Sequence, residues 1–261
     1  MKIFILADIE GAAGVTNYAK QCEPGGREYS LAKTWLTSEV NAAIAGICDE
    51  SPDSSIVVWD GHGESCVHLN ELDERAEYIP RGPFEPPYGL DESFDGFFFV
   101  GQHARASSGG VLCHSYTFAC EGMWLNGVEV GEFGCRAAMA GVLSVPILFL
   151  SGDDFACREA EELIPGIITV TTKKTINENL AVTLHPRRAC ELIREGARKA
   201  IQQSSQVKPF KINPPYEQKI RLKKPEDFDR WFANRPATVE VEALDNRTGV
   251  LRADNLFDLH I

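Results

Sequence analysis

The sequence has no C-x-x-C pair, no apolar run long enough to cross a bilayer, and a deficit of positive charge. Its 261 residues include 26 Lys and Arg against 38 Asp and Glu, which gives a formal net charge of −12. This balance argues against a protein that binds nucleic acid or an anionic membrane surface through nonspecific charge. The eight irregularly spaced cysteines predict reduced, mostly buried thiols, and therefore a cytoplasmic protein.

Several common catalytic motifs are also missing. There is no G-x-x-x-x-G-K-[ST] sequence, so a phosphate-binding P-loop is excluded, and there is no H-E-x-x-H sequence. Gly11 and Gly14 form only a partial dinucleotide-binding fingerprint. The stretch 63–66 lacks the closing glycine of a G-x-S-x-G elbow. These absences disfavour the usual nucleotide-binding and serine-hydrolase interpretations.

Short apolar runs alternate with longer stretches of helical periodicity. The runs are residues 3–7, 56–59, 96–100, 146–150 and 167–171. Continuous apolar runs are typical of strands that are buried on both faces of a parallel sheet. Between them, apolar residues recur at helical spacing over 36–47 and 189–201. This alternation predicts an α/β fold with a largely parallel sheet flanked by helices.

The pattern of the sequence changes after Val207, where the alternation of apolar runs and helical stretches ends. A connector interrupted by prolines spans 208–215. Candidate strands follow near 219–222, 238–242 and 250–253, around a short helix near 226–232. We therefore predict an α/β catalytic, metal-binding domain over 1–207 and a small α+β appendage over 208–261, which would serve in assembly or as a lid.

Polar side chains follow three of the predicted strands. Asp8 and Glu10 follow the first strand, and because they are two residues apart they point to the same side of extended backbone. His62 follows the second strand and His103 the third. A polar loop that caps the next helix is the alternative for the carboxylates, and a structural role is the alternative for a lone histidine. The repetition at equivalent strand ends favours a metal site.

Two further groups belong with this set. Glu132 opens a helix-like stretch, where the helix dipole favours an acid whatever its function, and His114 follows His103 by eleven residues. Three carboxylates and two imidazoles without a thiolate fit zinc, manganese or cobalt better than calcium. Five ligands exceed the three of a typical catalytic zinc site, which suggests two ions with Asp8 as a bridge. The implied reaction is metal-assisted hydrolysis, with His114 as the unligated group that transfers a proton or stabilises an oxyanion.

These residues, in this order, resemble the zinc-dependent D-aminopeptidase family of bacterial dipeptide-transport operons. The resemblance runs from Met1 to about Lys208, and each motif is short, but their order and spacing are specific. The motifs are residues 7–11 (A-D-I-E-G), 60–62 (D-G-H), 101–107 (G-Q-H-A-R-A-S), 113–115 (C-H-S), 131–134 (G-E-F-G), 151–154 (S-G-D-D) and 159–165 (E-A-E-E-L-I-P).

The resemblance implies a dinuclear zinc peptidase that removes an N-terminal residue, preferably a D-amino acid, from short peptides. It also implies a ring-shaped homo-oligomer such as a decamer, with its active sites facing an inner channel. Matched position by position, His114 looks like the catalytic residue. The residues that look like metal ligands are Asp8, Glu10, His62, His103 and Glu132.

Two other functions use the same features. A dinuclear-metal amidase or phosphoesterase would use the same ligands, although only Arg105 is an obvious basic residue near the strand ends, which disfavours a phosphate substrate. A non-catalytic metal-binding protein is disfavoured because every assigned position holds a competent residue. Asp153 and Asp154 could hold the α-ammonium group of a peptide, or Asp153 could simply cap the helix that follows.

Overall fold

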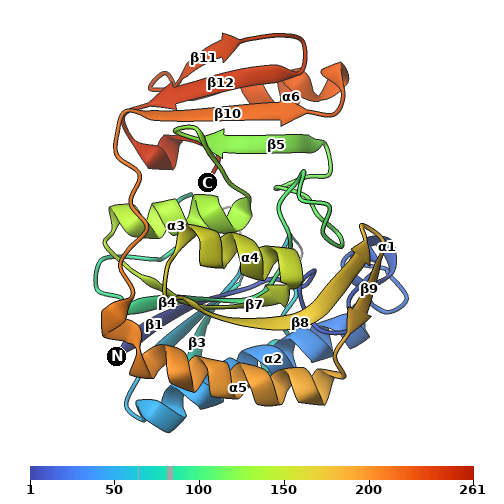
Figure 1. The fold of residues 1–261 in the computed structure, drawn as a ribbon, viewed down its shortest axis with the longest axis vertical. Coiled ribbons are helices and arrows are strands. Elements are labelled where there is room, and N and C mark those ends of the chain that lie inside the picture. Colours follow the sequence, from blue (N-terminus) through green and yellow to red (C-terminus); the bar gives the residue numbers. More distant parts are fainter. Residues whose placement is uncertain (64, 81–84) are drawn as a thin grey trace.

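The computed structural model describes residues 1–63, 65–80 and 85–261, and a seven-stranded sheet lies at its centre (Figure 1). The strand order is β3-β2-β1-β4-β7-β8-β9, and all neighbours are parallel except the antiparallel pair β8 and β9. The bounds are β1 (Lys2–Ala7), β2 (Ser55–Asp60), β3 (Ala76–Ile79), β4 (Gly96–Gln102), β7 (Ile147–Asp153), β8 (Ile168–Asn177) and β9 (Leu180–Thr183). Strands β4 and β7 are buried along their whole length, which explains their continuous apolar character.

Helices cover both faces of this sheet (Figure 1). One face carries α2 and α5 and the other carries α3 and α4. The bounds are α1 (Tyr18–Gln21), α2 (Tyr29–Glu50), α3 (Glu132–Val142), α4 (Asp154–Leu163) and α5 (Pro186–Gln202). Gly46 lets α2 approach α5 closely, because a Cβ atom there would lie 2.2 Å from the carbonyl oxygen of Arg194. Helix α5 begins at Pro186, and the side chain of His185 caps it by accepting a hydrogen bond from the Arg187 N–H.

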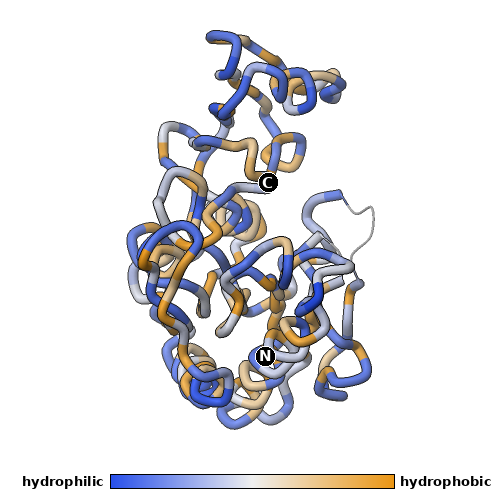
Figure 2. Tube along the Cα trace, turned by 90° about the vertical axis from the view of Figure 1, so that its right-hand side faces the viewer, coloured by the Kyte–Doolittle hydropathy of each residue, from blue (hydrophilic) through white to orange (hydrophobic). Residues whose placement is uncertain are grey.

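A second, antiparallel sheet lies beyond α3, in the order β11-β12-β10-β5-β6 (Figure 1). The bounds are β5 (Cys120–Leu125), β6 (Val128–Glu129), β10 (Tyr216–Leu222), β11 (Glu240–Ala243) and β12 (Thr248–Ala253). The short helix α6 (Phe228–Phe232) lies beside these strands. Along the whole chain, 3-10 turns lie at Leu69–Glu71, Ser204–Gln206, Pro225–Asp227 and Leu256–Asp258. Residues 120–129 and 216–253 form this sheet together, so its strands come from both sides of position 207. The end of the chain lies between this sheet and α3 (Figures 1 and 2).

The predicted α/β fold with an α+β unit toward the C-terminus is confirmed. All five strands predicted for the main sheet are present, although β4, β7 and β8 extend further at their carboxyl ends. The sequence interpretation missed β3 and β9 because both lie at sheet edges, where partly exposed side chains leave no continuous apolar run. It also missed β5, whose apolar residues do not form a continuous run, and β6, which has only two residues. The helix expected over 226–232 is a 3-10 turn followed by α6.

Strands β2, β1 and β4 are the part of the sheet that positions the functional residues. They are adjacent and parallel, so their carboxyl ends lie along one edge of the sheet. Ligand sites of open α/β sheets form at such edges. In the part of the chain that the structure describes, no helix is both long enough and apolar enough to span a membrane.

Candidate metal centre

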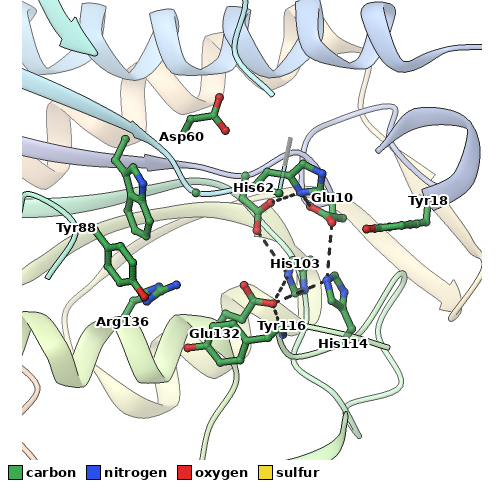
Figure 3. Close-up of a pocket in the computed structure, with 14 residues that line it drawn as sticks. Glu10, Tyr18, Asp60, His62, Tyr88, His103, His114, Tyr116, Glu132 and Arg136 are labelled. Carbon is green, nitrogen blue, oxygen red and sulfur yellow. Dashed lines mark hydrogen bonds and ion pairs between the residues drawn. The ribbon is translucent and has the colours of Figure 1, made fainter. Parts of the chain in front are cut away.

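Four of the predicted site residues follow the three central strands. Asp8 and Glu10 follow β1, His62 follows β2 and His103 follows β4, and all four side chains are at least nine-tenths buried. Their ends converge because β1 lies between β2 and β4 in the sheet. Figure 3 shows Glu10, His62 and His103 pointing into one cavity, which Asp8 also lines.

Glu132 and His114 complete the cluster from the other side of the cavity (Figure 3). Glu132 is the first residue of α3, and its Oε1 accepts a hydrogen bond from the Tyr116 N–H at 2.6 Å. His114 comes from the segment between β4 and β5, and its Nδ1 lies 2.8 Å from the carbonyl oxygen of Leu112. The structure thus brings together all six residues that the sequence singled out.

Two glycines allow the chain segments that carry these groups to touch. The Gly11 N–H donates to the carbonyl oxygen of Gly101 at 2.7 Å. A Cβ atom on Gly11 would lie 2.1 Å from the carbonyl oxygen of Gln102, and one on Gly101 would lie 2.0 Å from that of Asp8. Gly101 also has a φ of +80°, which side chains disfavour. The two ligand-bearing segments can therefore lie this close only because both positions lack side chains.

The two imidazoles that follow strands sit between the carboxylates. His62 Nδ1 lies 3.4 Å from Asp8 Oδ1 and 3.0 Å from Glu10 Oε2. His103 Nε2 lies 3.6 Å from Asp8 Oδ2 and 3.3 Å from Glu132 Oε1. The two oxygens of Asp8 therefore face different imidazoles, one on each side of the cluster.

His114 closes the network. Its Nε2 lies 3.8 Å from Glu10 Oε1 and 3.9 Å from Glu132 Oε1. The ring stacks on His103, with centroids 3.9 Å apart, and on Phe118 at 4.6 Å. This sandwich fixes the plane of the imidazole.

Backbone carbonyl groups orient the strand-end histidines. His62 Nε2 lies 2.7 Å from the carbonyl oxygen of Cys22, and His103 Nδ1 lies 2.9 Å from that of Ala104. A ring nitrogen that faces a carbonyl oxygen carries the proton, which leaves the other nitrogen of a neutral imidazole with a free lone pair. That second nitrogen faces the carboxylates in both cases. Metal-ligating histidines are held in this way.

The charges of the cluster shift its pKa values strongly. Burial raises the pKa of Glu10 to about 7, and the charge of Asp8 adds to this effect. Burial also acts to raise the pKa of Asp8, but hydrogen bonding with His62 and the charge of His103 hold it below its usual range. Burial lowers the pKa of both imidazoles, yet Glu10 and Glu132 raise those of His62 and His103 well above the usual value. Protons on the imidazoles thus balance the carboxylates, and bound cations would replace them.

The donor set fits divalent metal ions. One group of ligand atoms that lie within 4.8 Å of one another comes from His103, His114 and Glu132, and a second comes from Asp8, Glu10 and His103. Glu10 Oε2 is buried, and the group that faces it is His62 Nδ1 at 3.0 Å. A metal ion held between a carboxylate oxygen and an imidazole nitrogen would replace the proton that otherwise lies between them. Mixed nitrogen and oxygen donors suit zinc, manganese or cobalt.

The cavity around the cluster has a volume of about 310 Å³. Tyr18 lies on one side of the carboxylates, and Tyr88 and Arg136 lie on the other (Figure 3). The sequence interpretation did not identify these three residues, nor Tyr116. Only Arg136 had a local signal, because it follows Glu132 by four residues and therefore shares its helix face.

Asp153 and Asp154 have structural roles. Asp153 Oδ1 caps α4 by accepting from the Phe155 and Ala156 N–H groups, and its Oδ2 accepts from Ala104 at 2.7 Å. The Asp154 carboxylate accepts from Thr175. Both oxygens of Asp153 thus accept hydrogen bonds, which agrees with the capping alternative, and neither residue lines the metal-site cavity.

Comparisons with known proteins agree with this geometry. A family model described as D-aminopeptidase, peptidase M55, matches residues 1–260. A D-aminopeptidase of Bacillus subtilis (strain 168) is 36% identical over 218 residues, which cover 82% of this chain and 78% of the relative. The solved structure of the Zn-dependent D-aminopeptidase DppA from Bacillus subtilis, a self-compartmentalizing protease, matches with a TM-score of 0.90 and 31% identity, over 99% of this chain and 93% of that one. The chain belongs to the peptidase M55 family of D-aminopeptidases.

Proposed function

We propose that the protein is a zinc-dependent aminopeptidase that releases N-terminal D-amino acids from short peptides. The observation that carries the proposal is the convergence of three carboxylates and three imidazoles around one cavity of about 310 Å³ at the carboxyl ends of the central strands. Family membership and 36% identity to a D-aminopeptidase support the reaction class. The preference for D-amino acids rests on these relatives.

The ligands of two zinc ions in this proposal are Asp8, Glu10, His62, His103 and Glu132. Asp8 would lie between the ions, because its Oδ1 faces His62 and its Oδ2 faces His103. When bound, zinc polarises the scissile carbonyl group and makes a nucleophile available at neutral pH. The same donors would accept manganese or cobalt.

His114 is the proposed catalytic residue. Burial and the charge of His103 lower its pKa to about 4, so its ring is neutral at pH 7. Its Nδ1–H is engaged by the carbonyl oxygen of Leu112, which leaves Nε2 as the proton acceptor. A neutral Nε2 can take a proton from the attacking water and deliver it to the leaving amine.

The proposal extends to assembly and location. The structural neighbour is described as self-compartmentalizing, so we expect this chain to form a ring-shaped homo-oligomer. The hairpin of β8 and β9 exposes Ile176, Leu180 and Val182, which are 50–64% exposed and would supply apolar contacts. The eight free cysteines suit a reducing cytoplasm. Sedimentation of the purified protein tests the assembly.

The decisive experiment combines metal analysis with substrate comparison. Protein stripped of metal and reloaded with zinc should bind about two ions per chain. It should hydrolyse D-Ala-p-nitroanilide faster than the L isomer and lose activity when a chelator removes the metal. Equal rates for the two isomers would overturn the D-preference. Hydrolysis of p-nitrophenyl phosphate without hydrolysis of either anilide would favour a phosphoesterase instead.

A further inference from the structure

Arg136 is a buried cation in the wall of the metal-site cavity. It lies on α3, one helical turn after Glu132, and only 8% of the residue is exposed. It lines the cavity that the metal-binding side chains line (Figure 3). No other lysine or arginine lines this cavity among the described residues.

Aromatic rings surround the guanidinium group. Its central carbon lies 4.2 Å from the ring centroid of Tyr88, 5.1 Å from that of Trp59 and 5.5 Å from that of Tyr116. Tyr88 and Trp59 are themselves stacked, with centroids 4.5 Å apart. Ring faces attract a cation and hold it in place, but they do not neutralise its charge.

Arg136 has no carboxylate side chain as an ion-pair partner within residues 1–63, 65–80 and 85–261. It donates a hydrogen bond to a main-chain oxygen of Ile261, the last residue of the sequence, and the Tyr88 hydroxyl donates to Ile261 as well. A guanidinium group has five N–H donors, so donors remain for a ligand. The N–H donors that Ile261 does not occupy can bind an anionic group of a ligand in the cavity.

The cavity therefore has two ends of opposite character. Asp8, Glu10 and Glu132 make the metal-binding end acidic, whereas Arg136 lies beside Glu132 on the side away from Tyr18 (Figure 3). A ligand that reaches the metal-binding end with its scissile bond would place an anionic group best at Arg136. Arginine binds carboxylates through two parallel hydrogen bonds.

We infer that Arg136 binds the C-terminal carboxylate of the peptide substrate and so restricts the enzyme to very short peptides; this inference rests on the proposed aminopeptidase function. Residues four apart on a helix have Cβ atoms about 5–6 Å apart. A peptide extends by at most about 3.3–3.6 Å per residue. Glu132 and Arg136 lie one helical turn apart and line the same cavity, so a ligand that reaches both is short, which corresponds to dipeptides and tripeptides.

The wild-type zinc enzyme gives the first test. D-Ala-D-Ala and D-Ala-D-alaninamide differ only in the terminal charge, and D-Ala-p-nitroanilide has no carboxylate at all. We expect kcat/KM to be at least about tenfold higher for the acid than for the amide, mainly through KM. Equal KM values with all three compounds cleaved would overturn the role of Arg136 and leave the aminopeptidase function standing. Failure to cleave any of them would overturn both.

Substitutions give the second test. Arg136→Met should remove the preference for the acid while the KM for the amide changes by no more than about twofold. Arg136→Lys should keep part of the preference, because it keeps the charge. Arg230→Met is the matched control. Arg230 is exposed and lines a second, neighbouring cavity together with Arg136, but Arg230 does not line the metal-site cavity. An acid preference that persists in Arg136→Met would show that Arg136 only anchors Ile261.

The third test measures peptide binding in a variant that does not turn the peptide over. It does not use Arg136→Met, so it remains available if that variant fails to fold. Zinc-loaded His114→Ala should bind D-Ala-D-Ala at least about tenfold more tightly than D-Ala-D-alaninamide in calorimetry. Equal dissociation constants for the two peptides would overturn the inference.

Discussion

The imidazole rings of His103 and His114 stack with centroids 3.9 Å apart and planes only 8° from parallel. Two imidazolium ions at this distance would repel each other, so the two rings differ in protonation. Glu132 raises the pKa of His103 against the effect of burial, whereas burial and the charge of His103 lower the pKa of His114 to about 4. The stack therefore keeps His114 as a neutral base beside a site that favours cations.

This arrangement predicts that His114→Ala keeps its metal and loses turnover. The expected loss of kcat is about 10²–10⁴-fold, the usual contribution of a general base. Zinc content and the rate with D-Ala-p-nitroanilide measure the two properties separately. His68→Ala is the control, because the His68 ring contacts the Ser30 carbonyl oxygen outside the cavity. Loss of zinc in His114→Ala would assign His114 to the ligands instead.

Asp8→Asn should lose both metal and activity. The amide keeps the size of Asp8 but removes the negative charge and one of the two oxygens that face His62 and His103. We expect zinc content to fall from about two ions per chain to one or fewer. Asp154→Asn is the matched control, since its carboxylate accepts from Thr175 and lies outside the cavity. Full zinc content in Asp8→Asn would exclude the bridging role.

The convergence of Asp8, Glu10, His62 and His103 could be predicted from the sequence because parallel sheets place equivalent strand ends together. Asp8, His62 and His103 each follow a short apolar run. The three strands are adjacent in the sheet, so these side chains lie close together. The same argument predicted the α/β fold, because strands buried on both faces differ clearly from helices in their pattern.

The opposite end of the cavity could not be predicted in this way. Trp59, Tyr116 and Arg136 meet there although they lie far apart in the chain, and no local pattern marks that contact. An arginine inside a helix usually lies on its solvent face, so its spacing from Glu132 alone did not indicate burial. The second sheet could not be predicted for the same reason, because β5 pairs with β10, which follows it by more than ninety residues.

Lys173→Met should weaken metal binding although Lys173 is not a ligand. Its buried Nζ donates to the carbonyl oxygens of Glu10, Ala12 and Val15, and so fixes the segment that carries Glu10. We expect zinc affinity to fall by about 10–100-fold, as for other changes behind a metal ligand. Competition with a chelator measures this affinity. Lys174→Met is the control, because Lys174 is the exposed neighbour on β8; an unchanged affinity in Lys173→Met would refute the positioning role.

Glu39 should make the stability of the protein fall between about pH 4.5 and pH 7. Glu39 is fully buried on α2, and burial raises its pKa from 4.5 to about 7. The hydrogen bond from the Ala13 N–H and the charge of Lys173 act in the opposite direction but are smaller. The folded state therefore holds this proton more tightly than the unfolded chain does. The resulting stabilisation is fully present below about pH 4.5 and is lost as the pH rises through about 7.

The loss amounts to about 3 kcal/mol of unfolding free energy. Glu39→Gln removes the titrating group and keeps the oxygen that accepts from Ala13. Urea unfolding at pH 5 and pH 8, with metal removed from both proteins, should therefore show a larger fall for the wild type than for the variant. The difference arises because the wild type alone must place a carboxylate charge in the core at pH 8. Parallel pH profiles for the two proteins would show that Glu39 is already ionised at pH 5.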